Sequence, residues 1–577
     1  MDIIMNQLFM PGAHAAIRPF VFFSYGVLIA AAAGCSDGSG EGEAECGNGI
    51  VEAGELCDGN CPVACDDDLA CTTDTLAGAD CSRQCLFTPV AACLGGDGCC
   101  PAACDIDGDS DCPAGCGDAV CQAGETCAGC PEDCGACPTC SDGIQNQGET
   151  GIDCGGPCEA CPPPVADYYV APTGDDDAAG TFEAPFATWE KLSDVMQAGD
   201  LAYIRGGTYR NTKPLPFDDW SPVCRFSNLD GTESEPIRIW AYPGEHPVLD
   251  MSDIPETSVS TGMIGVFVSS SAHVWFRGLR VTGLQQNHDG NHDVSTGWAT
   301  YEASNITIEN CEVDHIGGYG FTNGTDSNNN LYRNCDVHHC ADEFSTGYEF
   351  GGANGFGQTG NTGSTNTTYS GCRAWWNSDD GFDFFDDDGF ITVENSWAFW
   401  NGYIPDTFDA GGDGQGFKMG PNHTDMPTTF LRVMTNCLAV QNLAMGFDQN
   451  DANCLFHVYN NTAYDNETGG FFFPYHEGIE HIFRNNVSYG NGGSDVNSGR
   501  TGWTDDHNTW NGGVTASDED FAGLDASVLT APRQEDGSLP DIDLLHLAAG
   551  SDLIDAGVDV GLPYSGAAPD LGAFESE

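Results

Sequence analysis

From Asn305 to about residue 490, short runs of β-branched and aromatic residues alternate with Gly and Asn at a regular spacing. A unit that begins Asn-Cys-x-Val, or a close variant, recurs, and four of its six intervals are about 24 residues. In most units a Gly-Phe pair follows ten residues after the first position, whereas in two units it follows after 21, which indicates loop insertions. The units begin at Asn310, Asn334, Gly371, Asn395, Asn436, Asn460 and Asn485.

A fixed period in the twenties, with short strands between turn residues, is typical of a stacked repeat. Leucine-rich repeats have a similar period, but they require Leu at fixed positions and Leu is scarce in these units. We therefore expect residues 166–577 to form an all-β fold, a right-handed parallel β-helix in which equivalent residues stack about 4.8 Å apart. The six Asn that begin units are expected to form an internal ladder. A second column is expected from Cys311, Cys335, Cys372 and Cys437.

The segments before and after this repeat predict elements that cover or close the solenoid. Residues 187–197 place Trp189, Leu192, Val195 and Met196 on one helical face, which predicts a helix that covers the open end of the solenoid. Short strands are expected at 201–205 and 236–242. Residues 547–557 and 570–575 resemble the closing segment of secreted β-helix proteins.

The first 35 residues have the layout of a secretory signal, with Arg18 before an apolar run and small residues after it. Ala32-Ala33-Gly34-Cys35 resembles a bacterial lipoprotein cleavage site, so Cys35 is predicted to carry the lipid. An ordinary secretory signal is the alternative. We expect an exported protein, either secreted or anchored at the outer membrane by lipid alone.

Residues 36–165 are rich in cysteine. The stretch from Cys35 to Cys161 holds 23 of the 30 cysteines, and an even number remains when Cys35 is set aside. Export and an even count favour a small disulfide-rich region over zinc sites, since no His lies in it. Its segments resemble the Cys-rich repeats of myxobacterial exported proteins. We interpret the region as a stalk, with Pro162-Pro163-Pro164 as a linker.

The composition limits the partners. The chain of 577 residues has 88 Asp and Glu against 17 Lys and Arg, a formal charge of −71. Such a chain repels nucleic acid and anionic lipid surfaces. It suits a protein that binds cations, and calcium prefers carboxylate oxygens. We expect a monomer.

The repeat permits residues of neighbouring units to be aligned. One position before the Gly of each Gly-Phe pair are Asn354, Asp380, Gln415 and Met445, and two positions after it are Thr322, Gly357, Asp383, Lys418, Asp448 and Phe472. Asn354 should therefore lie one coil from Asp380, and Asp383 one coil from Lys418. Three carboxylates as close as Asp379, Asp380 and Asp383 favour a bound cation. An acidic turn without a metal is the alternative.

Lysine is rare in this chain: Lys418 follows only Lys191 and Lys213. A Lys beside carboxylates and a metal suits proton abstraction, with a simple ion pair to Asp383 as the alternative. Arg373 and Arg432 are candidates for binding substrate carboxylates, and a structural role is the alternative for each.

The segments Asn377-Ser-Asp-Asp-Gly-Phe-Asp383, Gly416-Phe-Lys-Met-Gly420 and Gly446-Phe-Asp-Gln-Asn450, in this order, resemble family 9 of the polysaccharide lyases, the pectate lyase type. The resemblance implies a β-helix that cleaves polygalacturonate by β-elimination. It also implies that Asp379, Asp380 and Asp383 are calcium ligands and that Lys418 is the base. Asn354 stands where the family has a fourth Asp ligand, and we expect its side-chain carbonyl oxygen to be the fourth calcium ligand, with one negative charge fewer.

The first functional hypothesis is thus a calcium-dependent lyase of an acidic polysaccharide. A glycoside hydrolase on the same fold is the second, with its two carboxylates among the same aspartates. A non-catalytic glycan-binding surface protein or adhesin is the third. The hydrolase leaves Lys418 without a role, and the missing Asp at 354 favours the adhesin.

Overall fold

The computed structural model divides the chain into two units, Met1–Pro162 and Pro163–Glu577. In the second unit the structure describes residues 163–576 except 211–219, 255–261, 287–293, 346, 360–365, 386–388, 421–429, 451, 453, 474–478 and 497–502. In the first unit it describes residues 64, 72–78, 83–89, 154, 158 and 161. The predicted signal, the lipid-bearing Cys35 and most of the Cys-rich repeats lie outside the described residues.

The described part of the first unit contains a small antiparallel pair of strands and disulfides. Strand β1 (Thr72–Ala77) pairs with β2 (Gln84–Pro89). A disulfide joins Cys154 to Cys161, and Cys85 and Cys158 are disulfide-bonded as well. These bonds agree with the predicted disulfide-rich region.

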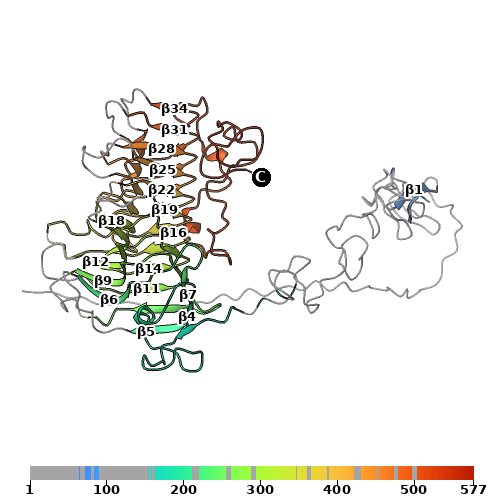
Figure 1. The fold of residues 1–577 in the computed structure, drawn as a ribbon. Coiled ribbons are helices and arrows are strands. Elements are labelled where there is room, and N and C mark those ends of the chain that lie inside the picture. The colour runs from blue at the N-terminus through green and yellow to red at the C-terminus, as the bar shows by residue number, and fades with distance from the viewer. Residues whose placement is uncertain are drawn as a thin grey trace, which may run out of the picture. The chain divides into compact units, whose positions relative to one another are not determined.

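The second unit is a right-handed parallel β-helix, which confirms the predicted fold. Successive coils stack in Figure 1 from β4 and β5 at one end to β34 at the other. Each full coil contributes one strand to each of three parallel sheets.

The first sheet consists of β3 (Tyr168–Val170), β4 (Leu201–Ile204), β7 (Ile237–Ala241), β10 (Val274–Arg277), β13 (Thr307–Glu309), β16 (Leu331–Arg333), β19 (Thr367–Ser370), β22 (Ile391–Glu394), β25 (Leu431–Thr435), β28 (Leu455–Tyr459), β31 (Ile482–Arg484) and β34 (Thr504–Asp506). The second sheet consists of β5 (Gly207–Arg210), β8 (Pro247–Asp250), β11 (Arg280–Thr282), β14 (Glu312–Asp314), β17 (Asp336–His338), β20 (Arg373–Trp375), β23 (Trp397–Phe399), β26 (Leu438–Val440), β29 (Thr462–Tyr464) and β32 (Val487–Tyr489). The third sheet consists of β6 (Trp220–Ser227), β9 (Gly262–Ser269), β12 (Ser295–Tyr301), β15 (Gly318–Gly324), β18 (Phe356–Thr359), β21 (Phe382–Asp383), β24 (Phe417–Lys418), β27 (Met445–Asp448), β30 (Gly469–Phe472) and β33 (Ser494–Val496).

The Gly-Phe pairs form a continuous stack inside the third sheet. The rings of Phe356 and Phe382 are stacked with centroids 4.8 Å apart, and those of Phe382 and Phe417 with centroids 4.7 Å apart. The preceding glycine is required because a Cβ on Gly381 would lie 2.7 Å from the Gly416 carbonyl oxygen. The repeat in the sequence is therefore a packing requirement of the coil interior.

The internal Asn ladder lies at positions other than those predicted. The Asn that begin the units have positive φ, between 47° and 60°, at the turn from the first sheet to the second. Asn tolerates this left-handed conformation, which explains its recurrence there. Of this set, a buried side-chain bond joins only Asn485 to Asn460, within the described residues. The long buried amide ladder is instead formed by Asn377, Asn401, Asn442, Asn466 and Asn491.

The predicted cysteine column is confirmed. Cys311, Cys335, Cys372 and Cys437 are buried free thiols. The column continues through Ser396, whose hydroxyl accepts a hydrogen bond from the Cys372 N–H. It extends to Asn461, whose side-chain oxygen accepts one from the Cys437 N–H. The column is thus a packing feature of the turn between the first and second sheets, directly after the residue with positive φ.

The N-terminal end of the β-helix is covered as expected, by a shorter element. The predicted helix is a 3₁₀ helix, η2 (Glu190–Asp194), with Trp189, Leu192 and Met196 buried in the core. The Ser193 hydroxyl bonds the carbonyl oxygen of Arg225 and accepts from the N–H of Ser227. Both belong to β6, the edge strand of the third sheet, so η2 satisfies backbone groups that an edge leaves open.

The C-terminal segment packs against the outer face of the second sheet. It contains the 3₁₀ helices η3 (Asp518–Asp520) and η4 (Ala526–Thr530). Its Leu529 and Leu571 share an apolar cluster with Trp397 and Leu438 of the sheet. The expected closing segment therefore lies along the side of the solenoid (Figure 1). No helix among the described residues is both long and apolar enough to span a membrane.

Candidate functional site

The register of the third sheet brings the predicted site residues together. Strands β21 and β24 pair Asp383 with Lys418, and β24 and β27 pair Lys418 with Asp448. The N–H of Asp380 donates to the side-chain oxygen of Asn354 at 2.8 Å. The predicted alignment of coils is thus confirmed at these positions.

Three aspartates form a buried cluster at the start of β21. Each of Asp379, Asp380 and Asp383 offers a carboxylate oxygen, and these oxygens lie within 4.8 Å of one another. The residues are 2%, 0% and 8% exposed. Buried carboxylates at this separation repel one another unless a positive charge lies between them.

Lys418 supplies a positive charge at this place. Its Nζ lies 3.0 Å from Asp380 Oδ2 and 3.8 Å from Asp383 Oδ2. The residue is 6% exposed, and its Nζ lies 5.6 Å from the centroid of the Phe385 ring. The amine therefore lies in a confined space between acidic groups and an aromatic ring.

The cluster has more negative than positive charge, and this excess shifts the pKa values of its groups. Burial and the charge of Asp380 raise the pKa of Asp379 well above its ordinary value. Burial and the charge of Asp383 raise the pKa of Asp380 to about 7, against the lowering effect of Lys418. Burial lowers the pKa of Lys418, but the three carboxylates outweigh burial and raise it. Without a metal, Lys418 is an ammonium.

Asn354 is oriented by two hydrogen bonds. Its Nδ2 donates to Asp383 Oδ2 at 2.8 Å, while its Oδ1 accepts from the Asp380 N–H. The amide therefore presents an N–H₂ group to the carboxylates, and its oxygen is already engaged. This orientation does not offer the carbonyl ligand expected from the sequence.

The two candidate arginines lie apart from the acidic cluster. Arg373 is 4% exposed and forms an ion pair of 2.7 Å with Asp336 on the neighbouring coil. Its Nη1 donates to the carbonyl oxygens of Leu529 and Ala531 in the C-terminal segment. These contacts favour the structural alternative for Arg373, which holds the C-terminal segment.

Arg432 is also inaccessible to a polymer. It is 0% exposed, on an inward position of β25, and its Nη1 donates to the carbonyl oxygen of Met419. Met419 follows Lys418 directly, so Arg432 fixes the backbone beside the lysine. This contact favours the structural alternative for Arg432.

Asp413 is a further neighbour of Lys418, one that the repeat pattern does not predict. Its Oδ2 lies 3.5 Å from Lys418 Nζ, and its N–H donates to Asp379 Oδ1 at 2.7 Å. It belongs to the second of the two insertions in the repeat, so no column contains it. The signal available in the sequence was an acidic residue enclosed by glycines, Gly411-Gly412-Asp413-Gly414, just before the Lys418 segment.

The donor set fits calcium. It consists of carboxylates alone, which is the chemistry that calcium prefers, and burial makes the uncompensated charge unfavourable. A Cβ on Gly412 would lie 2.5 Å from Asp379 Oδ1, so glycine lets the loop backbone approach the cluster. Asp379, Asp380 and Asp383 are the residues that would hold the ion.

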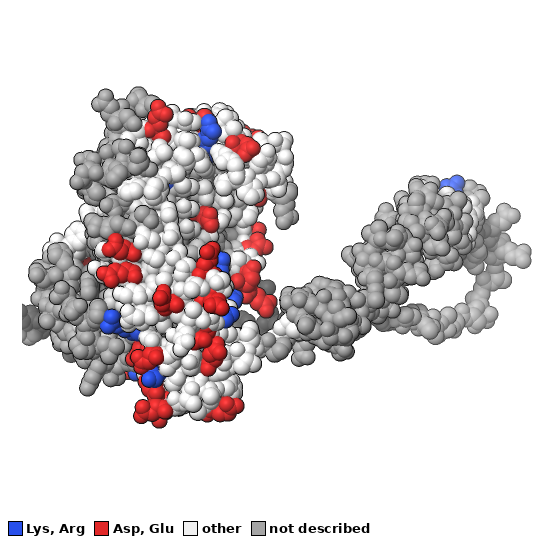
Figure 2. Space-filling view, in the orientation of Figure 1, with Lys and Arg blue, Asp and Glu red and all other residues white. Residues whose placement is uncertain are grey.

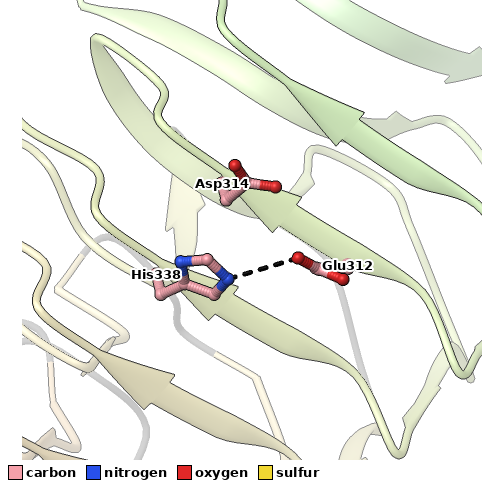
Figure 3. Close-up of side chains that lie close together, drawn as sticks. All are labelled: Glu312, Asp314 and His338. Atoms are coloured by element: carbon pink, nitrogen blue, oxygen red, sulfur yellow. Dashed lines mark hydrogen bonds and ion pairs between the residues drawn. The ribbon is translucent and has the colours of Figure 1, made fainter. Parts of the chain in front are cut away.

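A second group of metal-ligand side chains lies on the second sheet, where Glu312, Asp314 and His338 converge (Figure 3). Arg280 donates to both oxygens of Asp314, at 2.7 and 3.0 Å, and lies 3.2 Å from Glu312. The guanidinium already compensates this group. The cluster of Asp379, Asp380 and Asp383 instead has three carboxylates beside one cation, Lys418, so it suits calcium better than the group on the second sheet does.

Comparison with known proteins gives one consistent picture. Residues 168–492 match the family model described as Pel9A-like, right handed beta helix region. Pectate lyase L of Dickeya chrysanthemi is 35% identical over 419 residues, which cover 71% of this chain and 90% of that protein. Pectate lyase PEL9 of Emericella nidulans is 28% identical over 412 residues, covering 67% and 94%.

Two solved structures are similar along the same part of the chain. The crystal structure of pectate lyase Pel9A has a TM-score of 0.57 and 33% identity, covering 71% of this chain and 96% of that one. A rhamnogalacturonan lyase has a TM-score of 0.60 and 26% identity, covering 66% and 96%. The chain therefore belongs to the Pel9A-like right-handed β-helix family, the pectate lyase type of polysaccharide lyase family 9, and is a polysaccharide lyase.

Proposed function

We propose that this lyase cleaves polygalacturonate, or a closely related polyuronate, by calcium-dependent β-elimination, with Lys418 as the base. One observation carries the proposal: the Lys418 amine lies 3.0 Å from Asp380 within a buried, carboxylate-rich cluster. A cation among these carboxylates and an amine beside them are the two components that β-elimination of a uronate requires.

The chemistry of the chain's own residues follows from this geometry. Neutral Lys418 accepts the proton on C5 of the uronate residue. The C–H electron pair forms the C4–C5 double bond, the C4–O bond breaks, and the leaving oxygen takes a proton from solvent. The products are a shortened polymer and a chain with an unsaturated sugar at its new non-reducing end.

Calcium held by Asp379, Asp380 and Asp383 would supply the positive charge that binds the uronate carboxylate and makes the C5 proton more acidic. The same aspartates hold Lys418 as an ammonium when their charge is not compensated. Lys418 can therefore act as a base only when a bound cation compensates the negative charge of these aspartates. Arg432 positions the lysine through the Met419 carbonyl, and Asn354 positions Asp383.

The charge of the domain makes the local cation important. Residues 166–577 contain 62 Asp and Glu against 15 Lys and Arg. Figure 2 shows one face of the β-helix, on which patches of acidic side chains are scattered from one end to the other among mostly uncharged residues. This field repels a polyanion at long range, so a metal-dependent site explains how an acidic protein binds an acidic polymer.

The test is an assay of the full chain with polygalacturonate in parallel with rhamnogalacturonan, with and without calcium. The unsaturated product absorbs in the ultraviolet, so its formation reports β-elimination directly. We expect product from polygalacturonate with calcium, none after chelation, and none from Lys418→Ala. Product from rhamnogalacturonan alone would show that polygalacturonate is not the substrate. Activity that chelation does not affect would overturn the calcium assignment.

The same assay separates the other functions. New reducing ends without ultraviolet absorbance would indicate a glycoside hydrolase, and binding without either signal would indicate an adhesin. We also propose that the protein is exported and lipid-anchored at Cys35. Labelling with a radioactive fatty acid should be lost in Cys35→Ala, whereas secretion without label would favour the ordinary signal. Elution as a monomer in size-exclusion chromatography is expected.

A further inference from the structure

We propose that Asp413 is the fourth carboxylate of the calcium site and replaces the charge that is absent at Asn354. The inference rests on the proposed calcium dependence and adds to it a ligand from a loop outside the repeat.

Asn354 cannot act as a ligand in the observed orientation without losing a buried hydrogen bond. Its Oδ1 accepts from the Asp380 N–H at 2.8 Å, and a rotated amide would place an N–H₂ group against that N–H. Asn354 is 1% exposed, so water cannot replace the lost bond. The three remaining carboxylates would leave the ion with one fewer negative ligand.

Asp413 brings a further carboxylate to the Lys418 amine. The Lys418 ammonium lies 3.0 Å from Asp380 Oδ2, 3.8 Å from Asp383 Oδ2 and 3.5 Å from Asp413 Oδ2. A single positive centre is thus surrounded by oxygens of three residues, two from β21 and its approach and one from the loop before β24. The ammonium marks a position where a cation is favourable.

The sequence of the loop is adapted to this approach. A Cβ on Gly412 would lie 2.5 Å from both Asp379 Oδ1 and the Phe350 carbonyl oxygen, and a Cβ on Gly411 would lie 2.6 Å from the Ser378 carbonyl oxygen. Gly414 has a φ of +78°. The backbone N–H of Asp413 is then bound to Asp379 at 2.7 Å, which anchors the loop against the cluster.

Asp413 differs from the other carboxylates in exposure. Its side chain is 50% exposed, whereas those of Asp380 and Asp383 are 0% and 10% exposed. The buried aspartates are fixed, and Asp413 has room to shift by a rotation of its side chain from Lys418 to an ion. Asp413 would therefore complete the coordination of the ion on the solvent-exposed side of the cluster. Its rotation would also break the ion pair with Lys418, which helps to keep the amine protonated.

The experiment measures calcium binding to the full chain by isothermal titration calorimetry, with Asp413→Asn, Asn354→Asp and the double variant compared with the unchanged protein. We expect affinity to fall by about tenfold or more in Asp413→Asn, because calcium affinity follows the number of charged ligands. We expect it to rise in Asn354→Asp and to return close to the original value in the double variant. Asp409→Asn, an exposed carboxylate of the same loop, is the matched control for general charge.

A second readout reports ligation itself. Terbium replaces calcium at oxygen sites, and its luminescence lifetimes in H₂O and D₂O give the number of bound waters. Asp413→Asn should add about one water, and Asp409→Asn should add none. The proposal is overturned if Asp413→Asn binds calcium like Asp409→Asn, or if the number of waters is unchanged. Absence of calcium binding to the unchanged protein would instead overturn the calcium function itself.

Discussion

The Nζ of Lys418 lies 3.0 Å from Oδ2 of Asp380, which is on the neighbouring coil just before β21. Lys418 and Asp380 are both buried, so neither charge is screened by water. Each group controls the other: the carboxylates keep the amine protonated, and the amine limits the repulsion among the carboxylates. Five expected outcomes follow from this pair and from the coils that hold it.

Replacing Lys418 by Arg should remove activity and preserve the fold. Arginine keeps the positive charge beside Asp380 but does not lose its proton, so it cannot act as a base. The rate of product formation should fall by about 10²–10⁴-fold, the usual contribution of a general base. Lys418→Ala, in contrast, leaves the carboxylates unpaired and should destabilise the calcium-free protein by about 3–5 kcal/mol. Ultraviolet absorbance of the product and thermal unfolding measure the two effects, and an active Arg variant would exclude Lys418 as the base.

Calcium affinity should increase with pH between about 6 and 8. Burial raises the pKa of Asp380 to about 7, so protons compete with calcium below that pH and are released when it binds. Calorimetry in buffers of different ionisation enthalpy measures the released protons. No proton release at pH 6 would contradict this expectation.

The stability of the calcium-free protein should change in the opposite direction. The folded pKa of Asp380 lies above the ordinary carboxylate value of about 3.9, so this group stabilises the fold at low pH. That contribution is lost as pH rises from about 4 to 7. Calcium should therefore raise the unfolding midpoint more at pH 8 than at pH 5, as measured by scanning calorimetry.

Replacing Arg373 by Met should lower stability and leave the Michaelis constant unchanged. The side chain holds Asp336 and the C-terminal segment, and loss of one partner of a buried pair costs about 3–5 kcal/mol. Burial would raise the pKa of Asp336, but Arg533 and Arg373 lower it to about 2. The stabilisation is thus present above about pH 4 and is lost as pH falls toward 2. Urea unfolding at pH 7 and pH 3 measures both effects, and an altered Michaelis constant with unchanged stability would restore Arg373 as a substrate contact.

Replacing Asn442 by Ala should interrupt the buried amide ladder. Its Nδ2 donates to Asn466 Oδ1 and to the Ala398 carbonyl oxygen, both at 2.9 Å, and these acceptors would lose a donor. The expected loss is about 1–3 kcal/mol in the free energy of unfolding. Asn436→Gly is the control, because glycine accepts the positive φ of that turn and only a partly exposed bond is lost. Equal effects in urea unfolding would show that the ladder adds nothing specific.

The sequence alone was sufficient for the fold and for most of the site. A period of about 24 residues fixed the number of residues in a coil, and the Gly-Phe pairs fixed the register, because a stack of rings inside a coil tolerates no shift. Once the register was known, Asp383 had to lie beside Lys418. These conclusions depend on positions that repeat, because the coils of a single chain can be aligned with one another.

Only the tertiary structure decided what lies outside the repeat or depends on the direction of a side chain. Asp413 is brought to Lys418 by an insertion whose path no period describes, and Arg373 meets the carbonyl oxygen of Leu529 across 156 residues of chain. The Asn ladder was misplaced because Asn is favoured both by left-handed turns and by interior amide stacks. The orientation of Asn354 likewise follows from two buried hydrogen bonds that exist only when its coil and the next one are stacked. Periodic packing is encoded locally, whereas the contacts of loops and single polar groups are set by the folded chain as a whole.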